Sequence, residues 1–153
     1  MSEDFDPSAV DYAGIEPSTD SSFRVVKGGV FDLTVADIVF ETDAKQRGLL
    51  RLRYDFVDGQ ALEIIKEEGD DLVAPESLKP GAVWERFYFH TPKAIPMFAG
   101  WLEKMGLSWE DYKASSDKKA YVNSLQDYRF KAVIVVEEYE GRKSNKVKKY
   151  IKA

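Results

Sequence analysis

The chain of 153 residues contains no cysteine and only one histidine, His90. The missing thiols exclude disulfide bonds and thiolate metal sites, which fits a reducing compartment. They also remove one class of covalent nucleophile. Ser-His-Asp chemistry would have to use this one histidine, and no nucleophile motif surrounds any serine. A Walker-type phosphate loop and a dinucleotide glycine fingerprint are missing as well. We therefore expect a protein without catalytic activity and without a cofactor.

Long apolar runs and a basic N-terminus are also missing. No stretch is apolar for long enough to cross a bilayer, and the first residues are acidic where a signal peptide would be basic. The sequence therefore predicts a soluble intracellular protein. With 44% hydrophobic and 13% aromatic residues, the chain can bury one sizeable core, and we expect a single domain over residues 23–153.

Residues 1–22 contain no lysine or arginine and few large apolar side chains. Their acidic residues are Glu3, Asp4, Asp6, Asp11, Glu16 and Asp20. Such a segment buries too little apolar surface to order itself, so we expect a flexible acidic tail. Its simplest role is to solvate the protein. The alternative role is an arm that competes for a basic surface of the same chain or recruits a partner.

The most informative stretch lies at the C-terminal end, from Arg129 to Lys152. Apolar residues recur there at every second position, which predicts a strand with one face on the core. They are Phe130, Ala132, Ile134 and Val136. Residues 140–145 contain a Gly and an Asn, which tolerate positive φ, so we expect a turn there and a second strand over 147–151. Eight basic residues make this hairpin cationic in a chain whose net charge is -5.

Three longer strands are predicted before the hairpin. In 25–41 the apolar parity changes between Val35 and Ile38, which indicates a bend or a bulge. In 49–57, Arg51 and Arg53 share the face opposite the apolar residues. In 82–90 the face opposite the core carries both rings and positive charge. Its residues are Trp84, Arg86, Tyr88 and His90.

The segments between these strands and the hairpin are predicted as follows. A short strand is expected over 61–65, followed by a loop over 66–80 with several carboxylates. These are Glu67, Glu68, Asp70 and Asp71, whose spacing matches no calcium loop, so a solvated loop is the preferred interpretation. A helix is expected from Pro92 to Gly106, and two short ones near Ser108 and over 117–125.

Five strands with a helix between the third and the fourth are the layout of an OB-type barrel. The predicted fold is therefore mainly β with helices, a five-stranded OB-like β-barrel with a helical insertion between the third and fourth strands. Three stretches of the sequence then resemble a known family. They are GGVFDLTVADIVFE, VWERFYFH with TPKAIPMFAGWLEKMGL after it, and FKAVIVVEEYEGRKSNKVKKYI.

These stretches resemble the DUF669 family of small phage and prophage proteins. The resemblance covers the chain from about Phe23 to the C-terminus, and the loop over 66–80 is longer than in the family pattern. It implies an OB-like protein that binds single-stranded DNA in a replication or recombination module, in the cytoplasm of a bacterial host. Phage replication or recombination proteins would then be its partners.

The residues themselves suit such binding, because unpaired bases stack on side-chain rings while lysine and arginine contact the phosphates. We expect Trp84, Tyr88 and His90 to stack, and Tyr150 to do so more weakly. The groove is predicted to be lined by Arg51, Arg53, Arg86, Arg129 and Lys131. Four basic residues of the hairpin are predicted to contact the phosphate backbone of the DNA. They are Arg142, Lys143, Lys146 and Lys148. A register error of one residue would replace each strand's set by its neighbours.

Other interpretations of these residues stay open. The rings can belong to a second small cluster, the hairpin lysines can protect an edge strand, and the arginines can pair with acids on a neighbouring strand. The chain can also be a protein-interaction module whose aromatic face binds another replication protein. A metal-dependent nuclease would need converging carboxylates near a lysine, for which only Asp55, Glu63 and Lys66 come into question. Their spacing gives that class little support.

Overall fold

The computed structural model describes residues 6–9, 11, 13, 23–67, 69, 72 and 78–151. Most of the predicted acidic tail lies outside these residues; within it, Pro7–Ala9 forms one short 3-10 turn. Three carboxylates of the predicted loop, Glu68, Asp70 and Asp71, also lie outside them.

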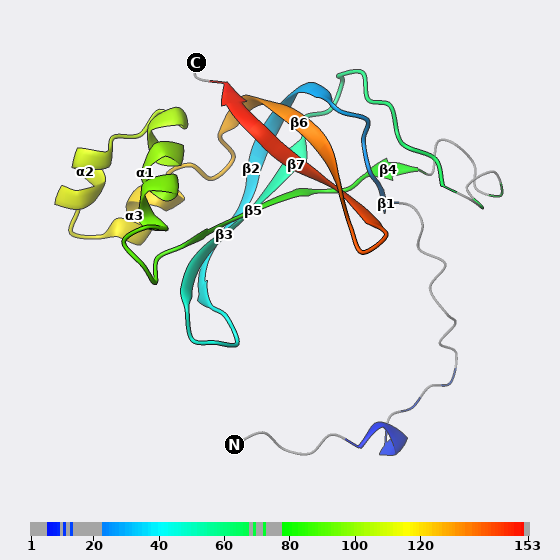
Figure 1. The fold of residues 1–153 in the computed structure, drawn as a ribbon, viewed down its shortest axis with the longest axis horizontal. Coiled ribbons are helices and arrows are strands. Elements are labelled where there is room, and N and C mark those ends of the chain that lie inside the picture. Colours follow the sequence, from blue (N-terminus) through cyan, green and yellow to red (C-terminus); the bar gives the residue numbers. More distant parts are fainter. Residues whose placement is uncertain are drawn as a thin grey trace.

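A five-stranded antiparallel sheet forms the body of the structure, in the order β5-β3-β2-β6-β7 (Figure 1). Its strands are β2 (Gly29–Thr42), β3 (Gly48–Phe56), β5 (Val83–Tyr88), β6 (Arg129–Tyr139) and β7 (Arg142–Ile151). The predicted mainly β fold with five principal strands is confirmed. The predicted parity change in the first of them is confirmed too, because the register of β2 on β3 shifts between Val35 and Asp37. This irregularity lets Leu33 and Ile38 both pack on the core.

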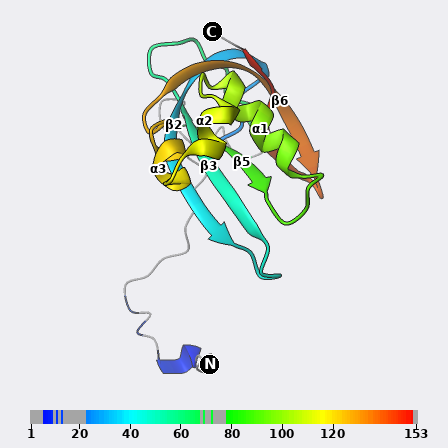
Figure 2. The same cartoon turned by 90° about the vertical axis from the view of Figure 1, so that its left-hand side faces the viewer.

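Three helices follow β5 in the chain and precede β6, as predicted. They are α1 (Ile95–Lys104), α2 (Trp109–Ala114) and α3 (Lys118–Asn123). Figures 1 and 2 show them grouped together beside one part of the sheet. The Ser108 side chain caps α2 by accepting from the Asp111 N–H at 3.2 Å. The first helix begins three residues later than expected, because Thr91 to Ala94 form a turn and Pro96 occupies the first helical turn instead.

The core lies between the inner faces of the strands and α1. Phe98 and Leu102 of α1 are buried, as their helical spacing predicts, and they join the inward residues of the sheet in one cluster. Gly106 adopts φ of 85° directly after this helix, a left-handed conformation that glycine reaches without strain. The helix therefore ends before Gly106, as the sequence predicts.

Two predictions for the segment before β5 are wrong. Residues 61–65 form no strand; Ile64 makes only an isolated bridge with Val26. Lys79–Pro80, expected in a loop, forms the short strand β4, which pairs in parallel with β1 (Phe23–Arg24). The backbone partners of both segments lie in the chain before β2, which no local pattern in 61–80 reveals.

The turn of the C-terminal hairpin is shorter than predicted. Only Glu140 and Gly141 form it, with φ of 51° and 78°, and β7 starts at Arg142. Two positive φ values are what a two-residue hairpin turn needs to match the twist of its strands. Asn145 therefore lies within β7, where its buried side chain accepts from the Val26 N–H and donates to the Val26 carbonyl, both at 2.8 Å.

β5 and β7 are the two edge strands of the sheet, and they approach each other without a hydrogen-bonded ladder. The Tyr150 hydroxyl on β7 donates to the Glu85 carboxylate on β5 at 3.1 Å. The sheet is thus not closed into a barrel, and side chains bridge the seam between its edges. No helix in the described part of the chain combines the length and the apolar character needed to cross a membrane.

Candidate nucleic-acid interface

The outer face of β3 and β5 carries the predicted basic and aromatic side chains in one array. Across this antiparallel pair Arg53 lies opposite Trp84 and Arg51 opposite Arg86. The residues between them on β3 are buried, so the predicted parity is confirmed for both strands. Trp84 is 44% exposed, a large value for so apolar a side chain.

Guanidinium groups lie over both rings of this face. The Arg51 guanidinium carbon is 5.5 Å from the centre of the Trp84 ring, and that of Arg47 is 4.9 Å from the centre of the Tyr88 ring. Arg47 was not among the predicted site residues. It comes from the turn between β2 and β3. The only sequence signal for a fixed side chain there was an acidic residue, Asp43, four residues before it in a polar loop.

Asp43 holds Arg47 in this position. The Arg47 side chain donates from Nε to a carboxylate oxygen of Asp43 at 2.7 Å, and its backbone N–H donates to the other oxygen at 3.0 Å. The backbone hydrogen bond, followed by that of the guanidinium, lowers the pKa of the Asp43 carboxyl. The loop that joins β2 to β3 therefore presents an arginine at the end of the array.

The two arginines of β3 also contact carboxylates, as one of the alternatives holds. Arg51 Nε lies 3.0 Å from Glu41 on β2, and Arg53 Nε lies 3.5 Å from Asp55. Neither Nε atom has a hydrogen-bond partner within the described residues, so these contacts are electrostatic only. Ion pairs between partly exposed groups contribute little free energy, which leaves both cations available to exchange their carboxylate for a phosphate.

A hollow of about 470 Å³ adjoins the array and brings in one residue of the hairpin. Trp84, Arg86 and Tyr88 line it from β5, and Lys146 lines it from β7. The Lys146 ammonium lies 3.9 Å from Glu137. His90 is exposed directly after β5, and its ring meets that of Tyr88 edge-on at 5.6 Å. Lys146 and His90 thus join the predicted face from two different segments.

Other predicted residues lie elsewhere. Arg129 and Lys131 are on β6, which is separated from β3 by β2, and they surround Asp32 at 3.2 and 4.0 Å. The structure does not bring them next to Arg51 and Arg53. Arg142 and Lys143 are exposed beside the hairpin turn, and Lys148 is exposed further along β7.

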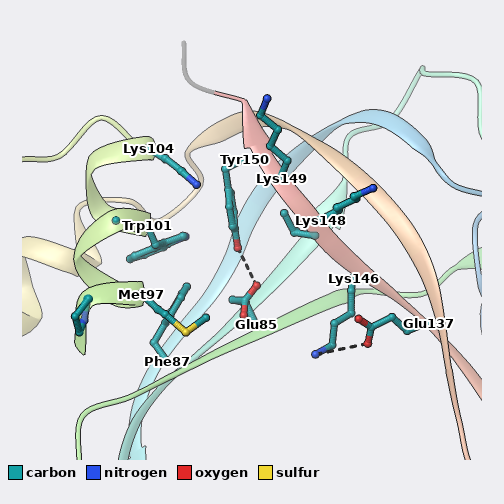
Figure 3. Close-up of a pocket in the computed structure, with 13 residues that line it drawn as sticks. Glu85, Phe87, Met97, Trp101, Lys104, Glu137, Lys146, Lys148, Lys149 and Tyr150 are labelled. Carbon is teal, nitrogen blue, oxygen red and sulfur yellow. Dashed lines mark hydrogen bonds and ion pairs between the residues drawn. The ribbon is translucent and has the colours of Figure 1, made fainter. Parts of the chain in front are cut away.

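Tyr150 packs on the core rather than joining the array, and Figure 3 shows its side chain pointing towards Glu85. Its hydroxyl lies 2.9 Å from that of Tyr54, which accepts from the indole N–H of Trp101 at 2.9 Å. Since Tyr150 donates to Glu85, the four side chains form one directed chain of hydrogen bonds. Burial raises the pKa of both tyrosines and of Glu85.

The inward position of Tyr150 has a local cause in the pairing of β6 with β7. Ile134 pairs with Val147 and Val133 with Lys149, so Lys148 is an extra residue in the ladder. This irregularity puts Val147 and Tyr150, three residues apart, on the same inner face. A strict period of two would place them on opposite faces.

The carboxylates considered for a nuclease do not meet. Asp55 contacts Arg53, and Glu63 contacts Lys27 at 3.3 Å. Among the described residues, no group of three or more histidine or carboxylate side chains is placed as metal ligands would be.

Neither the comparison with protein-family models nor that with curated proteins finds a match for this chain. The resemblance to the DUF669 family therefore rests on the sequence stretches quoted above.

Proposed function

We propose that the protein binds single-stranded DNA, without catalysis, on the outer face of β3 and β5. The observation that carries this proposal is the array in which Trp84 and Tyr88 each lie under a guanidinium group on an open sheet surface. Rings stack on unpaired bases, whereas the arginines and Lys146 neutralise phosphates. A duplex hides its bases between two strands and cannot use the rings in this way.

We further propose that the fold is an OB-like barrel with an open seam. The strand order β5-β3-β2-β6-β7, with helices between β5 and β6, supports this proposal, as does the side-chain bridge from β7 to β5. In OB folds the face of the second and third strands binds oligonucleotides, with the loop between the first two strands at its border. Here these elements correspond to β3, β5 and the loop that carries Arg47.

The biological setting follows from the family resemblance only. A protein of this kind would cover exposed single strands in a phage or prophage replication or recombination module, in the cytoplasm of a bacterial host. This step is an analogy at the level of family and fold, and the binding site itself does not depend on it.

Tryptophan fluorescence during titration with oligothymidine tests the proposal, at low and at moderate salt, with duplex DNA as the control. We expect quenching by the single strand that weakens with salt and exceeds the response to duplex. Absence of binding at low salt would contradict the proposal.

One observation favours a second candidate, a protein-interaction module. A hollow of about 340 Å³ between the β2–β3 hairpin and the helices is lined mainly by apolar side chains, among them Phe40, Phe89 and Tyr112. Apolar hollows of this kind are common at sites where proteins bind one another. If oligothymidine fails to bind, this hollow becomes the leading site.

A further inference from the structure

A further pocket lies at the seam between β5 and β7, with α1 along one side of it (Figure 3). Its volume is about 530 Å³, within the usual range of small-molecule sites. No residue of the array on β3 lines it. It is therefore distinct from the outer face of the sheet, although both meet at β5.

The walls of the seam pocket combine rings with positive charge. Trp101, Phe87 and Tyr150 line it, the first two with little exposed surface, and the Met97 side chain beside them is 70% exposed. Four lysines border the pocket. They are Lys104, Lys146, Lys148 and Lys149. This is the composition that holds a nucleotide, because a base packs on rings and sulfur while its phosphate meets ammonium groups.

Two carboxylates, Glu85 and Glu137, line this pocket beside the lysines. Glu85 points inward on β5, between the outward side chains of Trp84 and Arg86. Its oxygen accepts from the Tyr150 hydroxyl, whereas the nearby Lys146 contacts Glu137 instead. An ionised carboxylate has about four acceptor sites, so one hydrogen bond leaves it able to accept from a ligand.

Glu85 and Lys146 line the seam pocket and also the hollow beside Trp84. The two spaces are therefore neighbours across the edge of β5. A single-stranded DNA with one base stacked on Trp84 can bend over this edge of the sheet and place its next base in the seam pocket. No hydrogen-bonded ladder between β5 and β7 bars the way.

Resting on the proposed function, we infer that the seam pocket receives one base of the bound strand, and that Glu85 selects bases with an exocyclic amino group over thymine. Cytosine presents an amino donor where thymine presents a carbonyl oxygen. A carboxylate accepts from the first and repels the second. Apart from this group the two pyrimidines differ only by the 5-methyl group of thymine, so hydrogen bonding is the main basis of the selection.

The test compares oligodeoxycytidine with oligothymidine of equal length on the wild-type protein and on Glu85→Gln. Glutamine keeps the size of the side chain and can still accept from Tyr150, so the seam retains its structure. We expect the wild type to prefer cytidine by roughly ten- to hundredfold, the value of one charge-assisted hydrogen bond. The variant should lose most of this preference.

Glu137→Gln is the matched control, because Glu137 borders the same pocket and its loss removes the same charge. It should strengthen binding of both oligonucleotides alike and leave their ratio unchanged. Equal binding of both by the wild type, or a preference that Glu85→Gln preserves, would overturn this inference and leave the proposed function intact. Failure of both oligonucleotides to bind any of the proteins would overturn the two together.

Discussion

Trp84 is the residue on which the stacking argument depends most directly. Its ring is exposed on the sheet surface under the Arg51 guanidinium, and its removal leaves no cavity in the core. We expect Trp84→Ala to weaken binding of oligothymidine by about 1–3 kcal/mol, the contribution of one stacked base. Fluorescence anisotropy of a labelled oligonucleotide measures this loss independently of the tryptophan signal.

Trp84→Phe is the control for that variant. Phenylalanine keeps an aromatic face at the same position, so most of the affinity should remain. If the Trp84 ring does not contact the DNA, neither variant should change the affinity. If Trp84→Ala binds as tightly as the wild type, the outer face is not the site of stacking.

Glu85 makes the stability of the protein depend on pH. Burial raises the pKa of its carboxyl above the ordinary value of 4.5. The folded protein thus keeps this proton at pH values where the unfolded chain has lost it, and stability falls as pH rises through this window. Glu85→Gln should therefore raise the melting temperature at pH 7, and this gain should vanish below about pH 4.5, where both side chains are neutral.

Thermal unfolding followed by circular dichroism at several pH values measures this effect. Glu137→Gln serves again as the control, because its half-exposed side chain tests the loss of a charge at the surface of the same pocket. A gain from Glu85→Gln that is equally large at pH 4 and pH 7 would show that ionisation is not its cause.

Among the elements, β7 is joined to Val26, in the segment before β2, through the side chain of Asn145. The buried Asn145 side chain bonds both the N–H and the carbonyl of Val26, each at 2.8 Å, as a neighbouring strand would. We expect Asn145→Ala to lower the free energy of unfolding by about 1–3 kcal/mol, because it leaves buried backbone groups of Val26 unpaired. Urea denaturation measures the change. Ser144→Ala, at the exposed neighbouring position, should have almost no effect, and equal losses in both variants would refute the assignment.

The elements also show how far the sequence can be interpreted alone. The face of β3 and β5 was predictable because each strand has a regular period of two and one buried side, which fixes where Arg51 and Trp84 point. Tyr150 was not, because an extra residue at Lys148 reverses the parity and no residue type in β7 marks such an irregularity. Asn145 in turn was assigned to a turn by its type alone, although a contact 119 residues away determines its position.

The limits are similar for the site. Arg51, Arg53, Trp84, Arg86 and Tyr88 share a face because their two strands are neighbours, which strand order in the sequence suggests. Strand order cannot show that β2 separates Arg129 and Lys131 from them. Nor does local pattern reveal Glu85 in the seam, since that position depends on how closely the two edges of the sheet approach.

Charge is distributed unevenly over the whole molecule. Six of the 27 acidic residues lie within residues 1–22, which have no lysine or arginine, so the rest of the chain carries a slight positive charge although the net charge is -5. Nucleic-acid binding depends on such local charge rather than on the sum. An overall acidic composition is therefore compatible with a cationic binding face.

Salt dependence can identify which cations of the molecule touch the strand. For single-stranded DNA, the logarithm of affinity falls with the logarithm of salt concentration by about 0.7 for each phosphate neutralised. Lys146→Ala removes a cation beside Trp84 and should reduce this slope by about 0.7.

Lys131→Ala is the matched control, because Lys131 contacts Asp32 on the part of the sheet that β2 separates from β3. It removes the same charge and should leave the slope unchanged. Equal reductions of the slope in the two variants would mean that the DNA strand also contacts β6, and not only β3 and β5.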